Sequence, residues 1–148
     1  MARFLFILIT LLLMVSCEQS SQPLEGVQEE IVNNLTSCSW IKTNIKTFPD
    51  GTIFEGKDIW TFNKTGKGSH KSILRYNDGE PTEEIYYFQW SFTTSNFAVI
   101  CMDIQKFGIC YWQIEQLTST QLKVIEALED PILYPGTTKT DRSFNRMN

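Results

Sequence analysis

The chain contains a single histidine, His70, and this limits the catalytic chemistry that it could perform. A zinc site needs several cysteine or histidine ligands at close spacing, and no such partner stands near His70 in the sequence. A serine hydrolase would also need this histidine, but no serine lies in a Gly-x-Ser-x-Gly element. We therefore expect no metal, no cofactor and no enzymatic activity. His70 is then either a polar contact for a ligand or a core histidine bonded to a neighbour such as Tyr76.

The charged residues suggest solvated surfaces more than catalytic pairs. Glu83 and Glu84 end the acidic stretch GEPTEE, but adjacent strand residues point to opposite faces, whereas glycoside hydrolysis needs two carboxyls facing across a cleft. A basic stripe, which is either solvated or meets an anionic glycan or a partner, consists of Lys67, Lys71 and Arg75. The formal net charge of −4 argues against a nucleic-acid partner, because phosphate binding needs a basic domain.

Three of the four cysteines lie in the folded part of the chain. Cys101 and Cys110 flank a tight hairpin, and an even-length loop would place them on the same face of the sheet. In direct opposition they could form a disulfide, whereas an offset of two residues would leave them as small buried thiols. Both alternatives stay open. We expect Cys38, two residues before Trp40, to be buried and inert.

Turn signals recur along the chain and divide it into short β segments. The turns include FPDGT, NKTGKG and NDGEP, and the segments between them are rich in β-branched and aromatic residues. We expect strands at 37–47, 52–55, 57–63, 67–76, 83–93, 97–104, 109–117, 121–128 and 139–146. Residues 129–138, EDPILYPGTT, are expected to form a loop. A short helix is predicted where Val27, Ile31 and Leu35 are spaced by four. This pattern predicts an antiparallel sandwich or barrel.

Alternation within the strands predicts which side chains face the core. In IYYFQWSF every second residue is aromatic, which places Tyr86 and Trp90 inside. In KGSHKSILRY the lysines and the arginine share one face, and burying three charges is costly, so His70 points inward. A register with Phe62 opposite Gly68 sets Trp60 opposite His70, and we expect His70 to lie opposite Trp90 on the other side.

The N-terminal segment has the pattern of a secretory signal. A short basic start precedes an apolar run that ends at Ser16, and the run is too short to span a bilayer. Met14-Val15-Ser16-Cys17 resembles a bacterial lipobox, in which the cysteine is acylated after cleavage; an ordinary signal peptide is the alternative. We expect residues 1–16 to be a lipoprotein signal peptide, 17–26 a lipid-anchored linker and 27–148 the folded domain.

Four motifs in sequence order resemble those of bacterial lipocalin-like domain lipoproteins. LTSCSWIKT resembles their first strand, with Cys38 in place of the usual glycine. IWTFNKTGKG, FQWSF and CYWQIEQLTSTQLKV resemble three later strands and hairpins. This resemblance implies a single antiparallel up-and-down β-barrel of about eight strands. It also implies a protein held in the bacterial cell envelope by its lipid at Cys17, with the outer membrane expected and the domain in the periplasm or on the cell surface.

A barrel of this size is either just filled by side chains or holds one small ligand. We expect the lumen or ligand site to be lined by Trp40, Trp60, Phe62, His70, Tyr76, Tyr86, Phe88, Trp90 and Trp112. If these rings fill the interior, a ligand has to use the mouth, where Phe54, Phe107 and Tyr134 are expected. The sequence thus predicts an envelope-anchored protein that binds a small apolar or amphipathic ligand. The alternative is a protein-interaction, inhibitor or accessory module with a filled barrel.

Overall fold

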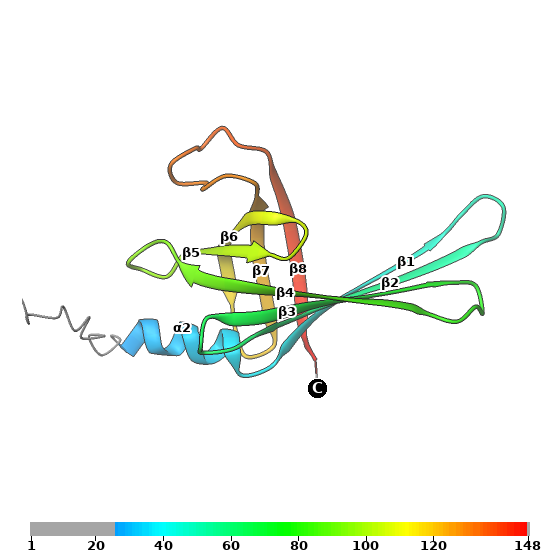
Figure 1. Ribbon diagram of the computed structural model, residues 1–148, viewed down its shortest axis with the longest axis horizontal. Coiled ribbons are helices and arrows are strands. Elements are labelled where there is room, and N and C mark those ends of the chain that lie inside the picture. Colours follow the sequence, from blue (N-terminus) through cyan, green and yellow to red (C-terminus); the bar gives the residue numbers. More distant parts are fainter. Residues whose placement is uncertain (1–25, 148) are drawn as a thin grey trace, which may run out of the picture.

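The computed structural model describes residues 26–147, which form one helix and eight strands (Figure 1). The helix is α2 (Gly26–Thr36). The strands are β1 (Ser39–Thr47), β2 (Ile53–Phe62), β3 (Lys67–Tyr76), β4 (Thr82–Phe92), β5 (Val99–Ile104), β6 (Gly108–Leu117), β7 (Gln121–Ala127) and β8 (Lys139–Met147). Each strand pairs antiparallel with the next and β8 returns to β1, so the sheet is a closed barrel. The predicted all-β up-and-down barrel with a short N-terminal helix is confirmed. The predicted signal peptide, Cys17 and nearly all of the linker lie outside the described residues.

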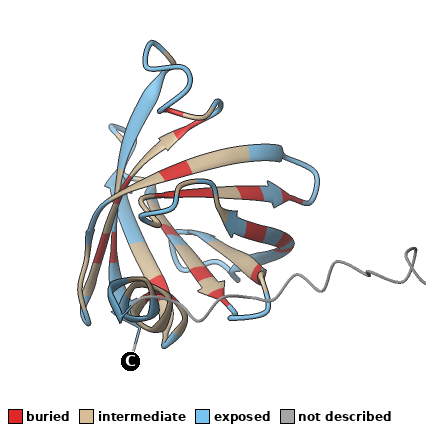
Figure 2. Ribbon diagram, turned by 90° about the vertical axis from the view of Figure 1, so that its left-hand side faces the viewer, coloured by how far each residue is buried: buried red, intermediate tan, exposed pale blue. Residues whose placement is uncertain are grey.

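Alternation along the strands places the rings inside the barrel as predicted. In β4 the buried residues are Tyr86, Phe88 and Trp90, and the residues between them are exposed. Red and pale segments alternate along the strands for this reason (Figure 2). The two segments expected at 52–55 and 57–63 are one continuous strand, β2, because Gly56 pairs with both of its neighbouring strands without interruption.

The predicted register between β2 and β3 is confirmed, with Trp60 opposite His70 and Phe62 opposite Gly68. The predicted pairing of His70 with Trp90 is wrong, since His70 lies opposite Tyr86. The connection between β3 and β4 turns at Asn77, which has a positive φ of 51°, earlier in the chain than the prediction required. The resulting shift of four residues is even, so every side chain keeps its predicted face.

The first four strands extend beyond the barrel as a projecting arm, residues 43–57 and 73–83 (Figure 1). β1 pairs with β8 only over Ser39–Ile41, although its pairing with β2 continues to Thr47. Tyr76, predicted to lie in the lumen, is on this arm. Its side chain is 55% exposed and its ring packs on Phe54 at 5.3 Å, because the strand has left the barrel before it reaches this residue.

Helix α2 packs against one end of the barrel, which we call the closed half. Leu35 is fully buried, and its carbonyl accepts a hydrogen bond of 3.0 Å from Trp40 Nε1. Of the three residues predicted on the apolar face of the helix, only Leu35 is fully buried, and Val27 is exposed. Aromatic and aliphatic side chains fill the interior here: Trp40, Phe62, Phe88, Trp90, Ile100, Met102, Trp112 and Leu122.

Of the two alternatives for Cys101 and Cys110, the disulfide is excluded, because the two residues lie on opposite faces of the sheet. Met102 pairs with Cys110, and Cys101 pairs with Tyr111. The hairpin loop has three residues between Ile104 and Gly108, an odd number, with positive φ at Lys106 and Gly108. Cys110 therefore faces the interior while Cys101 faces outward, and both are free thiols together with the partly buried Cys38.

Candidate functional site

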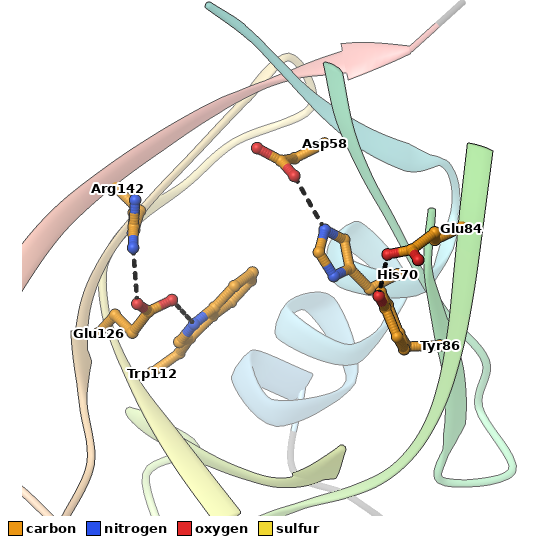
Figure 3. Close-up of polar contacts among 7 residues, drawn as sticks. All are labelled: Asp58, His70, Glu84, Tyr86, Trp112, Glu126 and Arg142. Atoms are coloured by element: carbon orange, nitrogen blue, oxygen red, sulfur yellow. Dashed lines mark hydrogen bonds and ion pairs between the residues drawn. The ribbon is translucent and has the colours of Figure 1, made fainter. Parts of the chain in front are cut away.

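A cavity of about 420 Å³ occupies the barrel end opposite α2, which we call the open half. The odd-numbered strands β1, β3, β5 and β7 run from the end that the helix covers toward this cavity. Helix α2 is visible behind the cavity in Figure 3. The cavity is lined by Lys42, Asp58, Trp60, His70, Ile104, Phe107, Gly108, Ile109, Cys110, Glu126, Leu128, Arg142 and Phe144. The lining therefore combines apolar side chains with five groups that can carry charge.

Stacked rings separate the cavity from the filled half of the barrel. Trp60 contacts Trp112 with ring centres 4.6 Å apart, and Trp112 stacks on Phe144 at 5.1 Å. Trp112 and Phe144 are almost fully buried. A molecule in the cavity would rest on this aromatic floor and could go no deeper without displacing it.

His70 lies at one wall of the cavity and contacts two side chains of β2. Its ring stacks on Trp60, nearly parallel at 4.1 Å, and its Nε2 is 3.0 Å from Asp58 Oδ1. The structure therefore gives His70 the partner Asp58 in place of the suggested Tyr76. Beside it, the Tyr86 hydroxyl donates a hydrogen bond to Glu84, and this bond raises the pKa of Tyr86 (Figure 3).

Glu126 organises the wall across from His70 (Figure 3). Its carboxylate accepts one hydrogen bond from Trp112 Nε1 at 3.2 Å and another from Arg142 Nη2 at 2.8 Å. The bond to Trp112 gives the indole of the floor a polar partner, as buried indoles usually require. Arg142 Nε is buried and has no hydrogen-bond partner among residues 26–147.

Within residues 26–147, Lys42 is the one cation of the cavity lining that forms no ion pair. It stands opposite Asp58 in the β1–β2 pairing, but no ion pair of Lys42 occurs within the described part of the chain. Asp58 already bonds His70, and Glu126 already bonds Arg142. The cavity thus presents one ammonium group that no carboxylate neutralises by direct contact.

Burial lowers the reactivity of Cys110, the cysteine of the cavity lining. Cys110 packs against the core, and its pKa rises from 9.0 to about 12, mainly through desolvation and then through the nearby charge of Glu126. A thiol with this pKa is almost wholly protonated at neutral pH and is a poor nucleophile. Among residues 26–147, no group of three or more His, Cys, Asp or Glu residues could hold a metal ion.

The structure divides the predicted lumen residues between three places. Trp60 and His70 line the cavity. Tyr86 is buried beside them, and Tyr76 is on the arm. The closed half and the floor take the remaining five: Trp40, Phe62, Phe88, Trp90 and Trp112. Of the residues expected at the mouth, Phe107 is exposed at the cavity rim, Tyr134 is exposed on the loop between β7 and β8, and Phe54 is half-buried on the arm.

Sequence reasoning missed the charged lining of the cavity. Four residues carry it: Lys42, Asp58, Glu126 and Arg142. Each stands two positions from a buried side chain of its own strand, as Lys42 does from Trp40 and Arg142 does from Phe144. The same alternation that placed the rings could therefore have placed these charges inside as well.

One further feature concerns membranes: in residues 26–147, the helix is neither long nor apolar enough to cross a bilayer.

No family model matches the chain, and no curated protein does. Two solved structures are similar at a low level. One is a redesigned β-barrel, mFAP1, bound to DFHBI, with 14% identity, a TM-score of 0.40, and coverage of 78% of this chain and 98% of the other. The second is EF1p2_mFAP2b bound to DFHBI, with 15% identity, a TM-score of 0.41, and coverage of 79% and 97%.

Proposed function

We propose that this protein binds a small amphipathic molecule in the open half of its barrel. The observation that carries the proposal is the cavity of about 420 Å³, which falls in the range of about 300–1,000 Å³ typical of small-molecule sites. Such sites are mostly apolar with a few fixed polar groups, and this lining has that character.

The lining suggests how such a molecule would be oriented. Trp60, Ile104 and Phe144 offer apolar surface on the inner side. Lys42 offers a cation that no carboxylate contacts, whereas Arg142 is held by Glu126. A ligand with an apolar body and an anionic or strongly accepting end fits this distribution of groups best.

We further propose that the protein is a lipoprotein of the bacterial envelope, anchored through acylated Cys17. The support is the sequence pattern around Ser16 and Cys17. Two or more acyl chains hold a protein stably, since each buried methylene contributes about 0.8 kcal/mol. Mass spectrometry of the N-terminal peptide from a membrane fraction should show an acylated Cys17, and an unmodified cysteine would refute the anchor.

The cavity is tested with the fluorescent amphiphile 8-anilinonaphthalene-1-sulfonate (ANS) in solution without vesicles. The wild-type protein should enhance its emission in a saturable way, and Ile104→Trp should reduce that enhancement at least tenfold by filling the cavity. Ile125→Trp is the matched control, because Ile125 lies opposite Gln113 on the outer face of the barrel. Equal binding by the wild type and Ile104→Trp, or no saturable binding by the wild type, would refute the proposal.

A protein-interaction module is the second candidate, and the arm favours it. Large apolar side chains are exposed on its strands, among them Ile45, Ile53 and Leu74. A photoreactive residue at Ile45 should crosslink a partner if the arm is the binding surface. A crosslinker at Val27, exposed on α2, serves as the control position.

A further inference from the structure

The loop between β7 and β8 presents three consecutive large apolar side chains to solvent. Ile132, Leu133 and Tyr134 are all more than half exposed, with Leu133 at 72%. Leu128 is also exposed where the loop begins. Single exposed apolar residues are common, but a contiguous exposed group on a folded domain usually marks a binding surface.

Hydrogen bonds hold these side chains in the outward position. Asp130 Oδ1 accepts the backbone N–H of Ile132 at 2.9 Å and that of Leu133 at 3.4 Å. The Asp130 carbonyl accepts the N–H of Tyr134 at 2.8 Å, and the Tyr134 carbonyl accepts the N–H of Thr137 at 3.0 Å. Pro131, in the same loop, is buried. The fold therefore maintains the exposure of this apolar tip, which we define as Ile132–Tyr134.

The apolar tip belongs to the same end of the molecule as the cavity mouth. Leu128, at the start of the loop, lines the cavity together with Phe107 of the β5–β6 turn, and both are exposed. In Figure 1 the loop projects beyond the barrel wall. Residues 131–138 contain no charged side chain, so the outermost part of this surface is uncharged.

We propose that the apolar tip inserts into the surface of a lipid bilayer. A stable protein interface buries about 800 Å² on each partner, and a convex tip of three side chains offers much less than that. A bilayer needs only a few apolar side chains at a protruding point, because each inserted group transfers independently into hydrocarbon. Tyrosine beside such groups is favoured at the membrane interface, where its ring and its hydroxyl are both accommodated.

This inference goes beyond the proposed function and also deepens it. A sparingly soluble amphiphile resides mainly in membranes, and docking through the apolar tip would bring the cavity mouth close to that source. Only this last step rests on the proposed function. Insertion of the tip itself depends on the loop alone.

A single introduced tryptophan can report the insertion. The four native tryptophans are at most 8% exposed, so brominated phosphatidylcholine vesicles should not quench them. In the full chain with Leu133→Trp, the same vesicles should quench the added emission by more than half. Ile45→Trp is the matched control, because Ile45 is 67% exposed but lies on the arm. An unquenched tryptophan at position 133, or equal quenching at position 45, would overturn the proposal.

A second measurement uses vesicle affinity, in chains of residues 17–148 carrying Cys17→Ser, so that neither the apolar leader nor a lipid tail contributes. Ile132→Ser combined with Leu133→Ser should lower partition onto phosphatidylcholine vesicles about tenfold or more, because two apolar side chains no longer leave water. Ile45→Ser combined with Ile53→Ser should leave it unchanged. Because the tip is uncharged, adding phosphatidylglycerol should change the wild-type partition less than twofold.

The remaining outcomes also decide the matter. If the tryptophan of Leu133→Trp shifts to the blue with rising protein concentration and no vesicles, a second copy covers the tip and the bilayer proposal fails. The cavity proposal is tested separately, by ANS binding in solution without vesicles, so its failure would leave the vesicle results for the tip unchanged. Conversely, Ile104→Trp should not change the partition onto vesicles.

Discussion

The two halves of the barrel are built from the same strands but hold different contents. On β2, Phe62 is buried among aromatic rings, whereas Asp58, four residues earlier on the same face, lines the open cavity. The closed half is covered by α2, and the open half borders the place where the first four strands leave the barrel. The number of strands therefore does not decide whether a barrel is filled, since the same eight strands enclose a packed core at one end and a cavity at the other.

The polar groups follow the same division. In the open half, Asp58 bonds His70, and Glu126 bonds both Trp112 and Arg142. In the closed half, the buried side chains among residues 26–147 are apolar or aromatic. Charges are tolerated inside this barrel only where water or a ligand can reach them, as the cost of desolvation requires.

The largest expected difference is between the closed half and the arm that leaves the barrel beside the open half, and it comes from truncating one phenylalanine in each. Phe62→Ala should lower the free energy of unfolding by about 3–5 kcal/mol, because the ring is buried against three other aromatic side chains. Phe54→Ala, on the same face of the same strand, should cost roughly 1 kcal/mol, since the half-buried ring leaves no closed cavity behind. Urea unfolding followed by tryptophan emission measures both. Equal losses would mean that the arm is packed as tightly as the closed half.

Adding a single methyl group at two glycines sharpens the comparison. A Cβ on Gly68 would come within 2.3 Å of the Phe88 ring and 2.6 Å of the Thr61 carbonyl oxygen. Gly68→Ala should therefore lower the free energy of unfolding by at least about 1–3 kcal/mol. A Cβ on Gly56 would meet the tip of the Phe54 ring at 3.0 Å. That ring is on the arm and can move, so Gly56→Ala should change the free energy of unfolding by less than about 1 kcal/mol. Thermal unfolding by circular dichroism compares the two, and a more harmful Gly56→Ala would contradict this account.

The smallest effect concerns the thiol at the boundary of the two halves. The pKa of Cys110 is raised from 9.0 to about 12. Between these two pH values the thiol stays protonated in the folded protein, whereas it ionises in the unfolded chain. Stability from this group is therefore complete below about pH 9 and is lost as the pH rises toward 12. At pH 9, iodoacetamide should modify Cys110 at least tenfold faster in urea than in the folded protein, as read by peptide mass spectrometry. A rate unaffected by unfolding would show that the thiol is already ionised and accessible in the fold, and the outward Cys101 in the same digest controls for reagent access.

The sequence was sufficient to predict the interior of individual strands because alternation is a local property. It assigned Tyr86, Trp90 and His70 to the correct face, and the turn after Phe62 fixed the β2–β3 register. Registers that depend on where a longer turn bends were less predictable. The β3–β4 pairing is displaced by four residues, and an odd loop put Cys101 and Cys110 on opposite faces.

The cavity was less predictable, since it depends on which side chains of neighbouring strands meet, and alternation within one strand does not determine that. Glu126 on β7 contacts Trp112 on β6 and Arg142 on β8, and no local pattern indicates that these three side chains meet. Tyr76 shows the opposite problem. Its face was assigned correctly, but alternation does not reveal that β3 has already left the barrel at this residue.

The join between the first and last strands has a consequence for how the wall of the barrel can move. β1 and β8 share three residue pairs, from Ser39 with Met147 to Ile41 with Asn145, whereas most neighbouring strands share six or more. Breaking this short join alone would turn the cylinder into a curved, open sheet without disturbing any other strand pair. Lateral fluctuation should therefore concentrate along this one line, which ends at Ile41, next to Lys42 in the cavity wall.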